Sequence, residues 1–171
     1  MLNEKVQQAL NEQLNFELHS AYIYYSMSAY CQSRDLVGMA SWFKVQAQEE
    51  LFHASKFFDY LCDRGGRVRM AEVKAPQIDW ETPLAAFADA HAHECEVSRR
   101  IHELVTLSQQ EKDRATESFL QWFVAEQVEE EATVSQIVGQ LKFVGSDGAG
   151  LFMVDQQLAA RTFVLPTATG A

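Results

Sequence analysis

A short segment, QEELFH at residues 48–53, places a carboxylate and an imidazole where a metal ion could bind. Glu50 and His53 are three residues apart, so on an α-helix their side chains point in the same direction. The residues one turn away on that face, Ala54 and Phe57, are apolar and belong in a core. A carboxylate on such a face needs a partner, because the burial of an unpaired charge is costly.

Three other segments also carry ligand-type side chains on apolar helical faces. Glu17 lies among leucine, alanine and tyrosine residues at helical spacing, and Glu94 among phenylalanine, alanine, valine and isoleucine residues. Gln127 and Glu130 repeat the three-residue spacing of the QEELFH segment. An offset of 77 residues pairs these positions: Glu17 with Glu94, Glu49 with Glu126, Glu50 with Gln127, and His53 with Glu130. The pattern predicts a two-fold site with one altered half.

The chemistry of this set favours metal ions over solvated side chains. For any single glutamate, a solvated helix face is the usual explanation. A solvated face does not explain the whole set of glutamates, because burying three carboxylates together would cost several kcal/mol per charge or force protonation. Oxygen-rich sites with one imidazole suit iron, and manganese less often, whereas zinc more usually recruits cysteines or several histidines. The residues therefore predict a two-metal carboxylate site.

The elements that must hold these side chains are helices. The chain has only three prolines and no long alternation of apolar and polar residues that would indicate strands. Apolar residues at helical spacing predict four long helices and one shorter helix. Their expected ranges are about 3–32, 35–64, 82–108, 113–143 and 147–161. Short links predict antiparallel neighbours within the first pair and within the second pair.

The segment between the second and third helices, residues 65–82, is too long for a tight turn. A helix of 28 residues is about 42 Å long, and eighteen extended residues can reach roughly 60 Å. The segment can therefore return the chain to the end where the second helix began, so that the second and third helices run parallel. The predicted architecture is all-α: a four-helix bundle over 1–145, a short fifth helix over 146–161 and a mobile tail over 162–171.

Composition narrows the classes of partner. Acidic residues outnumber basic ones 24 to 14, for a net charge of −10, which disfavours nucleic acid and acidic membrane surfaces. No leader follows Met1, and no apolar run is long enough to span a bilayer. Cys31, Cys62 and Cys95 lack the spacing of a zinc or redox motif, which suits buried thiols in a reducing compartment. We therefore expect a cytoplasmic protein.

Around these residues the sequence resembles the bacterial non-haem ferritins, and the resemblance extends over nearly the whole chain. The similar segments are LNEQLNFEL at 10–18, AQEE at 47–50, FDYL at 58–61, FLQWFVAEQVEEE at 119–131, and the fifth helix. The resemblance implies a ferritin-like four-helix bundle and a homo-oligomeric shell of 24 subunits. It also implies oxidation of Fe²⁺ by dioxygen or peroxide, with Fe³⁺ mineral stored inside the shell.

The resemblance also assigns roles by position. Glu17 and His53 would hold one iron, and Glu94 would hold the second. Glu50 would bridge the two ions, and Gln127 would lie close to the second.

Further positions resemble accessory features of the family. Tyr24 resembles the tyrosine beside the centre that can donate an electron, although without the resemblance a packed core aromatic is the simpler interpretation. Four residues resemble a third iron site of the bacterial members: Glu49, Glu126, Glu129 and Glu130.

Related families fit less well. A bacterioferritin would have histidine in place of Glu130 and a haem-binding methionine between Glu50 and His53, so no haem is expected. The mini-ferritins that protect DNA lack the fifth helix and often carry a basic tail, so no DNA binding is expected. Two other classes remain open: a di-iron oxygenase or peroxidase without a storage role, and a helical interaction module with solvated glutamates.

Overall fold

The structure, a computed structural model that describes residues 2–164, consists of helices and contains no strand within that range. The helices are α1 (Glu4–Ser33), α2 (Val37–Asp63), α3 (Pro83–Gln110), α4 (Arg114–Val144) and α5 (Gly148–Leu158). The expected all-α bundle with a short fifth helix is confirmed, although α5 ends three residues earlier than its spacing predicts. The expected mobile tail falls mainly on residues 165–171, which lie outside the described range.

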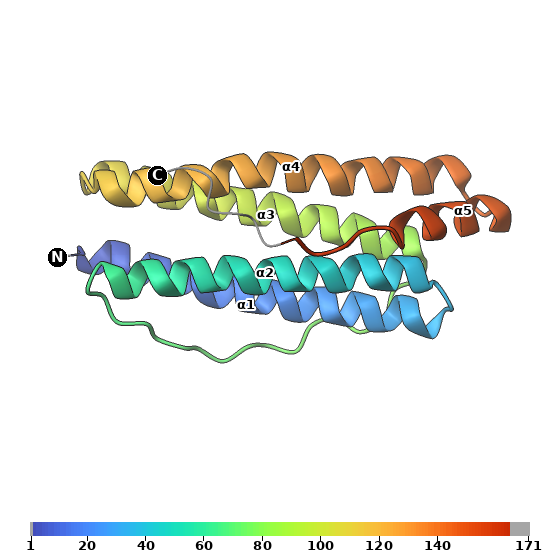
Figure 1. The fold of residues 1–171 in the computed structure, drawn as a ribbon, viewed down its shortest axis with the longest axis horizontal. Coiled ribbons are helices and arrows are strands. Elements are labelled where there is room, and N and C mark those ends of the chain that lie inside the picture. Colours follow the sequence, from blue (N-terminus) through green and yellow to red (C-terminus); the bar gives the residue numbers. More distant parts are fainter. Residues whose placement is uncertain (1, 165–171) are drawn as a thin grey trace.

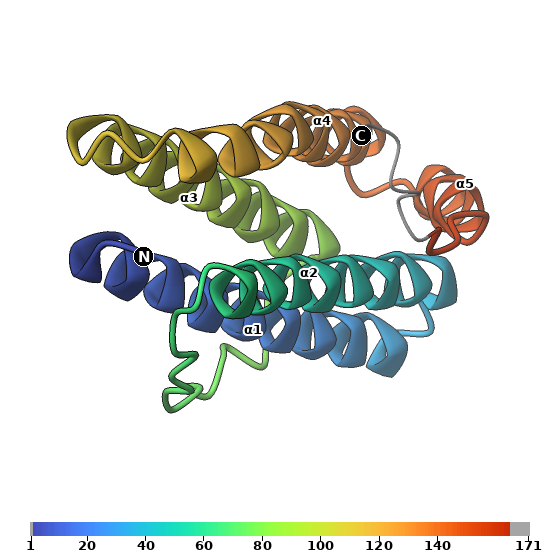
Figure 2. The same cartoon turned by 60° about the vertical axis from the view of Figure 1, so that its left-hand side comes forward.

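Two antiparallel helical hairpins, α1 with α2 and α3 with α4, form the bundle (Figure 1). The segment 64–82 carries no regular secondary structure and runs the length of the bundle along the outside of α1. It brings the chain back to the end where α2 begins, so α2 and α3 run in the same direction. At this end α5 lies across the helices (Figures 1 and 2).

Side-chain amides from α1 fix the path of that long crossover. Gln7, Asn11 and Asn15 are four residues apart on one face of α1 and bond to the crossover backbone over 67–71. For example, the Arg69 N–H donates to Asn11 Oδ1 at 2.6 Å, and Asn15 Nδ2 donates to the Arg69 carbonyl at 2.8 Å. These amides replace the partner strand that an extended segment would otherwise need.

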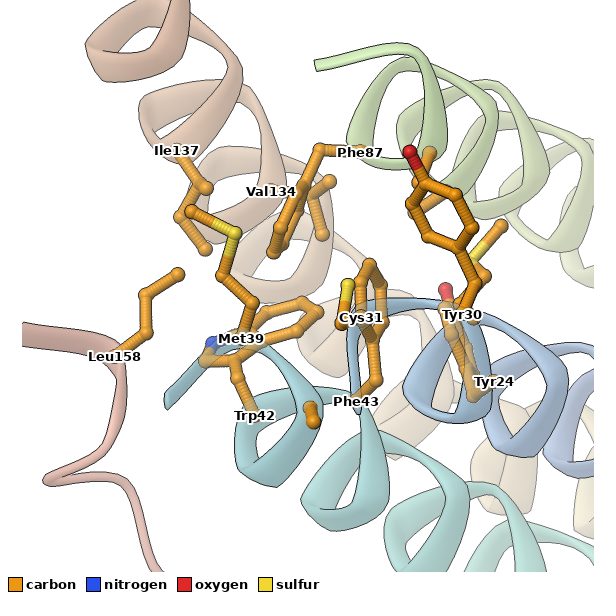
Figure 3. Close-up of a cluster of buried hydrophobic side chains, with 14 of the residues drawn as sticks. Tyr24, Tyr30, Cys31, Met39, Trp42, Phe43, Phe87, Val134, Ile137 and Leu158 are labelled. Atoms are coloured by element: carbon orange, nitrogen blue, oxygen red, sulfur yellow. The ribbon is translucent and has the colours of Figure 1, made fainter. Parts of the chain in front are cut away.

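The buried faces of the four long helices carry apolar side chains toward both ends of the bundle and polar side chains near the middle. One apolar cluster lies toward the α5 end, where Tyr24, Phe43 and Phe87 pack together (Figure 3). A second cluster, including Phe57 and Phe123, lies toward the N-terminal end. Between them are the buried polar side chains Gln13, Glu17, Gln46, Glu50, His53, Glu94, Gln127 and Glu130.

The fifth helix caps the second. Leu36, at the N-cap position of α2, cannot supply a side-chain oxygen to the first backbone N–H groups. Asp155 of α5 supplies it instead: its Oδ1 accepts from the Met39 N–H at 2.8 Å, and the residue is 4% exposed. The approach is close because Gly38 has no side chain, and a Cβ there would overlap the Asp155 carbonyl oxygen.

We therefore expect Gly38→Ala to release α5 while α1–α4 stay folded. The clash with backbone should cost roughly 1–3 kcal/mol of docking, measured as lost hydrogen-exchange protection over 148–158. Gly139→Ala is the matched control: it lies in α4 with nothing within 4 Å of a new Cβ, so it should stabilise the helix by about 0.5–1 kcal/mol. Full protection of α5 in Gly38→Ala would contradict this docking geometry.

The expectation of buried thiols is wrong for two of the three cysteines. Cys31 is buried, but Cys62 and Cys95 are exposed, and all three are free thiols. Each exposed cysteine directly follows a buried residue, Leu61 or Glu94, and one helical step turns a side chain by about 100° away from the core. Among residues 2–164 we find no helix with the length and apolar character of a membrane span.

Candidate metal centre

Glu17, Glu50 and His53 converge at the middle of the bundle. They are 0%, 1% and 2% exposed, and one potential ligand atom from each lies within 4.8 Å of the other two. Glu50 Oε2 is 3.4 Å from His53 Nδ1, so the three-residue spacing does place both groups on one face. The His53 ring packs edge-on against Trp122 and Phe123, which hold it in place.

Glu94 lies on the other side of the centre with two hydrogen-bond donors. The Tyr24 hydroxyl donates to Glu94 Oε1, and Gln127 Nε2 donates to Glu94 Oε2 at 3.1 Å. Glu94 is fully buried. The structure thus brings together Glu94 and Gln127, which the family resemblance places at the second ion, and Tyr24, which it places beside the centre.

The buried carboxylates carry a strong electrostatic penalty without a cation. Burial, and then the nearby Glu50, raise the pKa of Glu17 to about 8. Burial raises the pKa of Glu94 to about 7, with Glu130 adding to the shift, and the pKa of Glu50 lies well above its ordinary value for the same reason. Among the described side chains nothing bonds to Glu17 Oε2. This donor set fits hard cations such as iron.

A hydrogen-bonded chain from the surface orients Glu17. Arg100 stacks on the Phe16 ring at 4.2 Å and donates from Nε to Gln13 Oε1 at 3.0 Å. The buried Gln13 amide then donates from Nε2 to Glu17 Oε1 at 2.8 Å. Because Oε1 is occupied in this way, Oε2 is the atom left free for a metal ion.

Arg100→Gln should therefore weaken divalent-metal binding at the Glu17 position by about tenfold, the usual scale for groups that orient a ligand. Without the guanidinium, the Gln13 amide can rotate and turn its oxygen toward the carboxylate. Arg99→Gln is the control, because Arg99 pairs with Glu96 and Glu103 on the surface. Calorimetric titration with Co²⁺ measures the effect, and equal affinities in the two variants would exclude the orienting role.

The residues expected at a third ion are close to one another but do not form a compact cluster. Glu130 is buried and accepts from Gln46 Nε2 at 2.9 Å, and Glu49 is paired with Arg161 at 2.6 Å. Glu126 is half-buried and Glu129 exposed. Burial raises the pKa of Glu49 to about 7 against the opposing effect of Arg161, and burial also raises the pKa of Glu126.

Sequence patterns do not identify four supporting residues: Gln13 and Arg100 beside Glu17, and Gln46 and Arg161 beside the residues expected at the third ion. Gln13 and Gln46 carry no charge that would mark them as ligands, although both lie on the same apolar stripes as Glu17 and Glu50. Arg100 and Arg161, which orient those amides, give no local signal.

A second histidine lies near Tyr24. His93 packs edge-on to that ring at 5.9 Å and bonds through Nε2 to Ser20 Oγ at 2.8 Å. Burial lowers the pKa of His93 to about 4, so it is neutral at physiological pH.

A buried glutamate on α1, another on α3 and Glu-x-x-His on α2 match the ferritin-like class of carboxylate proteins, although α4 carries Gln127 and Glu130 in place of a second Glu-x-x-His. Comparison with known proteins agrees. The family model for the ferritin-like domain matches residues 7–144. The chain is 41% identical over 163 residues to the bacterial non-heme ferritin of Staphylococcus aureus, covering 95% of this chain and 98% of that protein.

Solved structures are similarly close. An engineered closed form of the Archaeoglobus fulgidus ferritin superposes with a TM-score of 0.95 at 50% identity, covering 96% of this chain and all of the other. The open-pore ferritin of the same archaeon superposes with a TM-score of 0.94 at 49% identity, and the match covers 95% of this chain and all of the other. The chain belongs to the ferritin family, which confirms the resemblance to bacterial non-haem ferritins.

Proposed function

We propose that this protein stores iron and oxidises Fe²⁺ at a two-ion centre inside each subunit, with dioxygen or peroxide as the oxidant. One observation carries the proposal: Glu17, Glu50 and His53 converge in the core with their ligand atoms within 4.8 Å. Burial of such a set is unfavourable unless cations neutralise it. Membership of the ferritin family makes iron the expected cation.

In this proposal Glu17 and His53 bind one Fe²⁺, and Glu94 binds the other. Glu50 lies between and bridges them, while Gln127 holds Glu94 in position through its hydrogen bond. Anionic oxygen ligands stabilise Fe³⁺ relative to Fe²⁺ and so favour oxidation. Rigid helices keep the two ions close enough to react with one oxidant molecule.

Tyr24 is proposed as an additional electron donor. Burial, together with the charge of Glu94, holds the pKa of Tyr24 well above its ordinary value, so the residue remains a phenol. Loss of an electron would make the phenolic proton strongly acidic, and Glu94 Oε1 is already positioned to accept it.

For storage, we propose a cytoplasmic shell of 24 subunits without haem, with α5 near the four-fold axes. The support is the family resemblance and the full-length similarity to ferritins. The net charge of −10 would help to attract and nucleate iron.

Anaerobic loading with Fe²⁺, followed by oxygen and a mass measurement on the same sample, tests this function. We expect rapid oxidation and retention of iron in a multi-subunit particle. A monomer or dimer that consumes a reductant without accumulating iron would instead support a di-iron oxygenase or peroxidase. Failure to bind Fe²⁺ at all would support a helical interaction module.

We also propose a third iron at Glu49, Glu126, Glu129 and Glu130. Glu130→Ala should then keep fast oxidation of the first two Fe²⁺ per subunit but change the ratio of iron oxidised to oxygen consumed, because a third iron supplies further electrons. Stopped-flow kinetics with an oxygen electrode measures both. Glu103→Ala, an exposed glutamate of α3, serves as the control. If Glu130→Ala keeps the ratio of iron to oxygen found in the unmodified protein, the proposed third ion is contradicted.

A further inference from the structure

The chain places one of its own cations beside the proposed third iron. Arg161 lies three residues beyond the end of α5, where the backbone turns back against α2 (Figure 1). Its Nη2 donates to Glu49 Oε2 at 2.6 Å, and its Nη1 donates to Gln46 Oε1. The guanidinium carbon is also 4.7 Å from the centre of the Trp42 ring, a favourable cation–π distance.

Arg161 acts on Glu130 as well, through Gln46. The Gln46 side chain is fully buried, and its oxygen accepts from Arg161. Its amide nitrogen is therefore turned toward α4, where it donates to Glu130 Oε2 at 2.9 Å. One guanidinium thus neutralises Glu49 directly and orients the amide that satisfies Glu130.

We propose, on the basis of the third iron proposed above, that the Arg161 guanidinium competes with that ion for Glu49. The ion then binds only after Arg161 withdraws. The Glu49 oxygen that accepts from Arg161 cannot at the same time offer that lone pair to a metal ion. A guanidinium and a divalent ion at the same carboxylate would also repel each other. The exchange replaces one positive charge by two.

The structure allows Arg161 to withdraw without unfolding α5. The arginine side chain is 24% exposed, and its neighbours Ala160 and Thr162 are exposed outside any helix. The helix itself is anchored separately, by the hydrogen bond from the Met39 N–H to Asp155. Occupancy of the third position should therefore be linked to the position of residues 159–164.

A calorimetric titration of the full-length protein with the divalent probe Co²⁺, kept anaerobic, tests the exchange. In Arg161→Gln we expect the first two equivalents to bind as in the unmodified protein and the third to bind about tenfold tighter, which corresponds to about 1.4 kcal/mol. Lys142→Gln removes the same charge from an exposed position in the last turn of α4 and should leave all three affinities unchanged.

Equal third affinities in Arg161→Gln and the unmodified protein would overturn the competition by Arg161 while leaving the third ion in place. Binding of only two equivalents of Co²⁺ to both proteins would contradict the third ion and the competition by Arg161 together, but would leave the main centre in place. Hydrogen exchange adds a structural readout: residues 159–164 of the unmodified protein should exchange faster once the third equivalent binds. An unchanged rate would contradict withdrawal.

Discussion

Replacement of Glu50 and His53 together by alanine is expected to slow the initial oxidation of Fe²⁺ by about 100-fold or more. The change removes the carboxylate proposed to bridge the two ions and the imidazole proposed to bind one of them. Within residues 2–164, these two groups and Glu17 form the one set of ligand-type side chains whose atoms meet within 4.8 Å. Stopped-flow absorbance after mixing with oxygenated buffer measures the rate.

The helices should persist in this double variant, because the two apolar clusters flanking the centre supply most of the burial. Circular dichroism and particle mass check that point. Gln48→Ala with Ser55→Ala, both on exposed faces of α2, is the matched control and should oxidise iron normally. Rapid oxidation in Glu50→Ala, His53→Ala would show that the chemistry occurs elsewhere.

The metal-free protein should become less stable as the pH rises from about 4.5 to about 8. In the unfolded chain Glu17 ionises near 4.5, whereas burial raises the pKa of the folded residue to about 8. Between these values folding takes up a proton, so the stabilisation is complete below 4.5 and is lost as the pH rises through 8. A tenfold difference in acidity between the folded and unfolded residue corresponds to about 1.4 kcal/mol of stability. Glu94 contributes over a narrower range, to about 7.

Urea unfolding at a series of pH values measures this profile. Glu17→Gln should make the decline shallower, because a neutral amide has no proton to lose and only the other buried carboxylates still contribute, whereas Glu12→Gln on the exposed side of α1 should not change it. Excess Co²⁺ should reverse the decline at high pH, since metal binding displaces protons from the carboxylates. A flat profile for the metal-free unmodified protein would contradict the buried, cation-requiring carboxylates.

Helical periodicity is sufficient to find the side chains that meet at the centre. Glu17, Glu50 and Glu94 each lie on an apolar stripe, and a residue on such a stripe directs its side chain toward the core. The length of the crossover likewise determines that α2 and α3 run in the same direction. The metal roles of these residues stay predictions, because a side chain's position does not by itself show which ion it binds.

The supporting contacts could not be predicted in the same way. The side chains of Gln13 and Gln46 are oriented by Arg100 and Arg161, which are 87 and 115 residues away in sequence. Periodicity gives the face of a helix, but not which side chain from another element reaches it. The docking of Asp155 on the start of α2 is the same case, because it depends on the fit at Gly38 rather than on any local pattern.

Crystals soaked anaerobically with Fe²⁺, with anomalous diffraction recorded at the iron edge, test the central claim most directly. We predict two peaks per subunit on either side of the Glu50 carboxylate, one within ligand distance of Glu17 and His53 and the other within ligand distance of Glu94. Iron found only at surface carboxylates, with the buried centre free of anomalous density, would contradict a two-ion centre in the core.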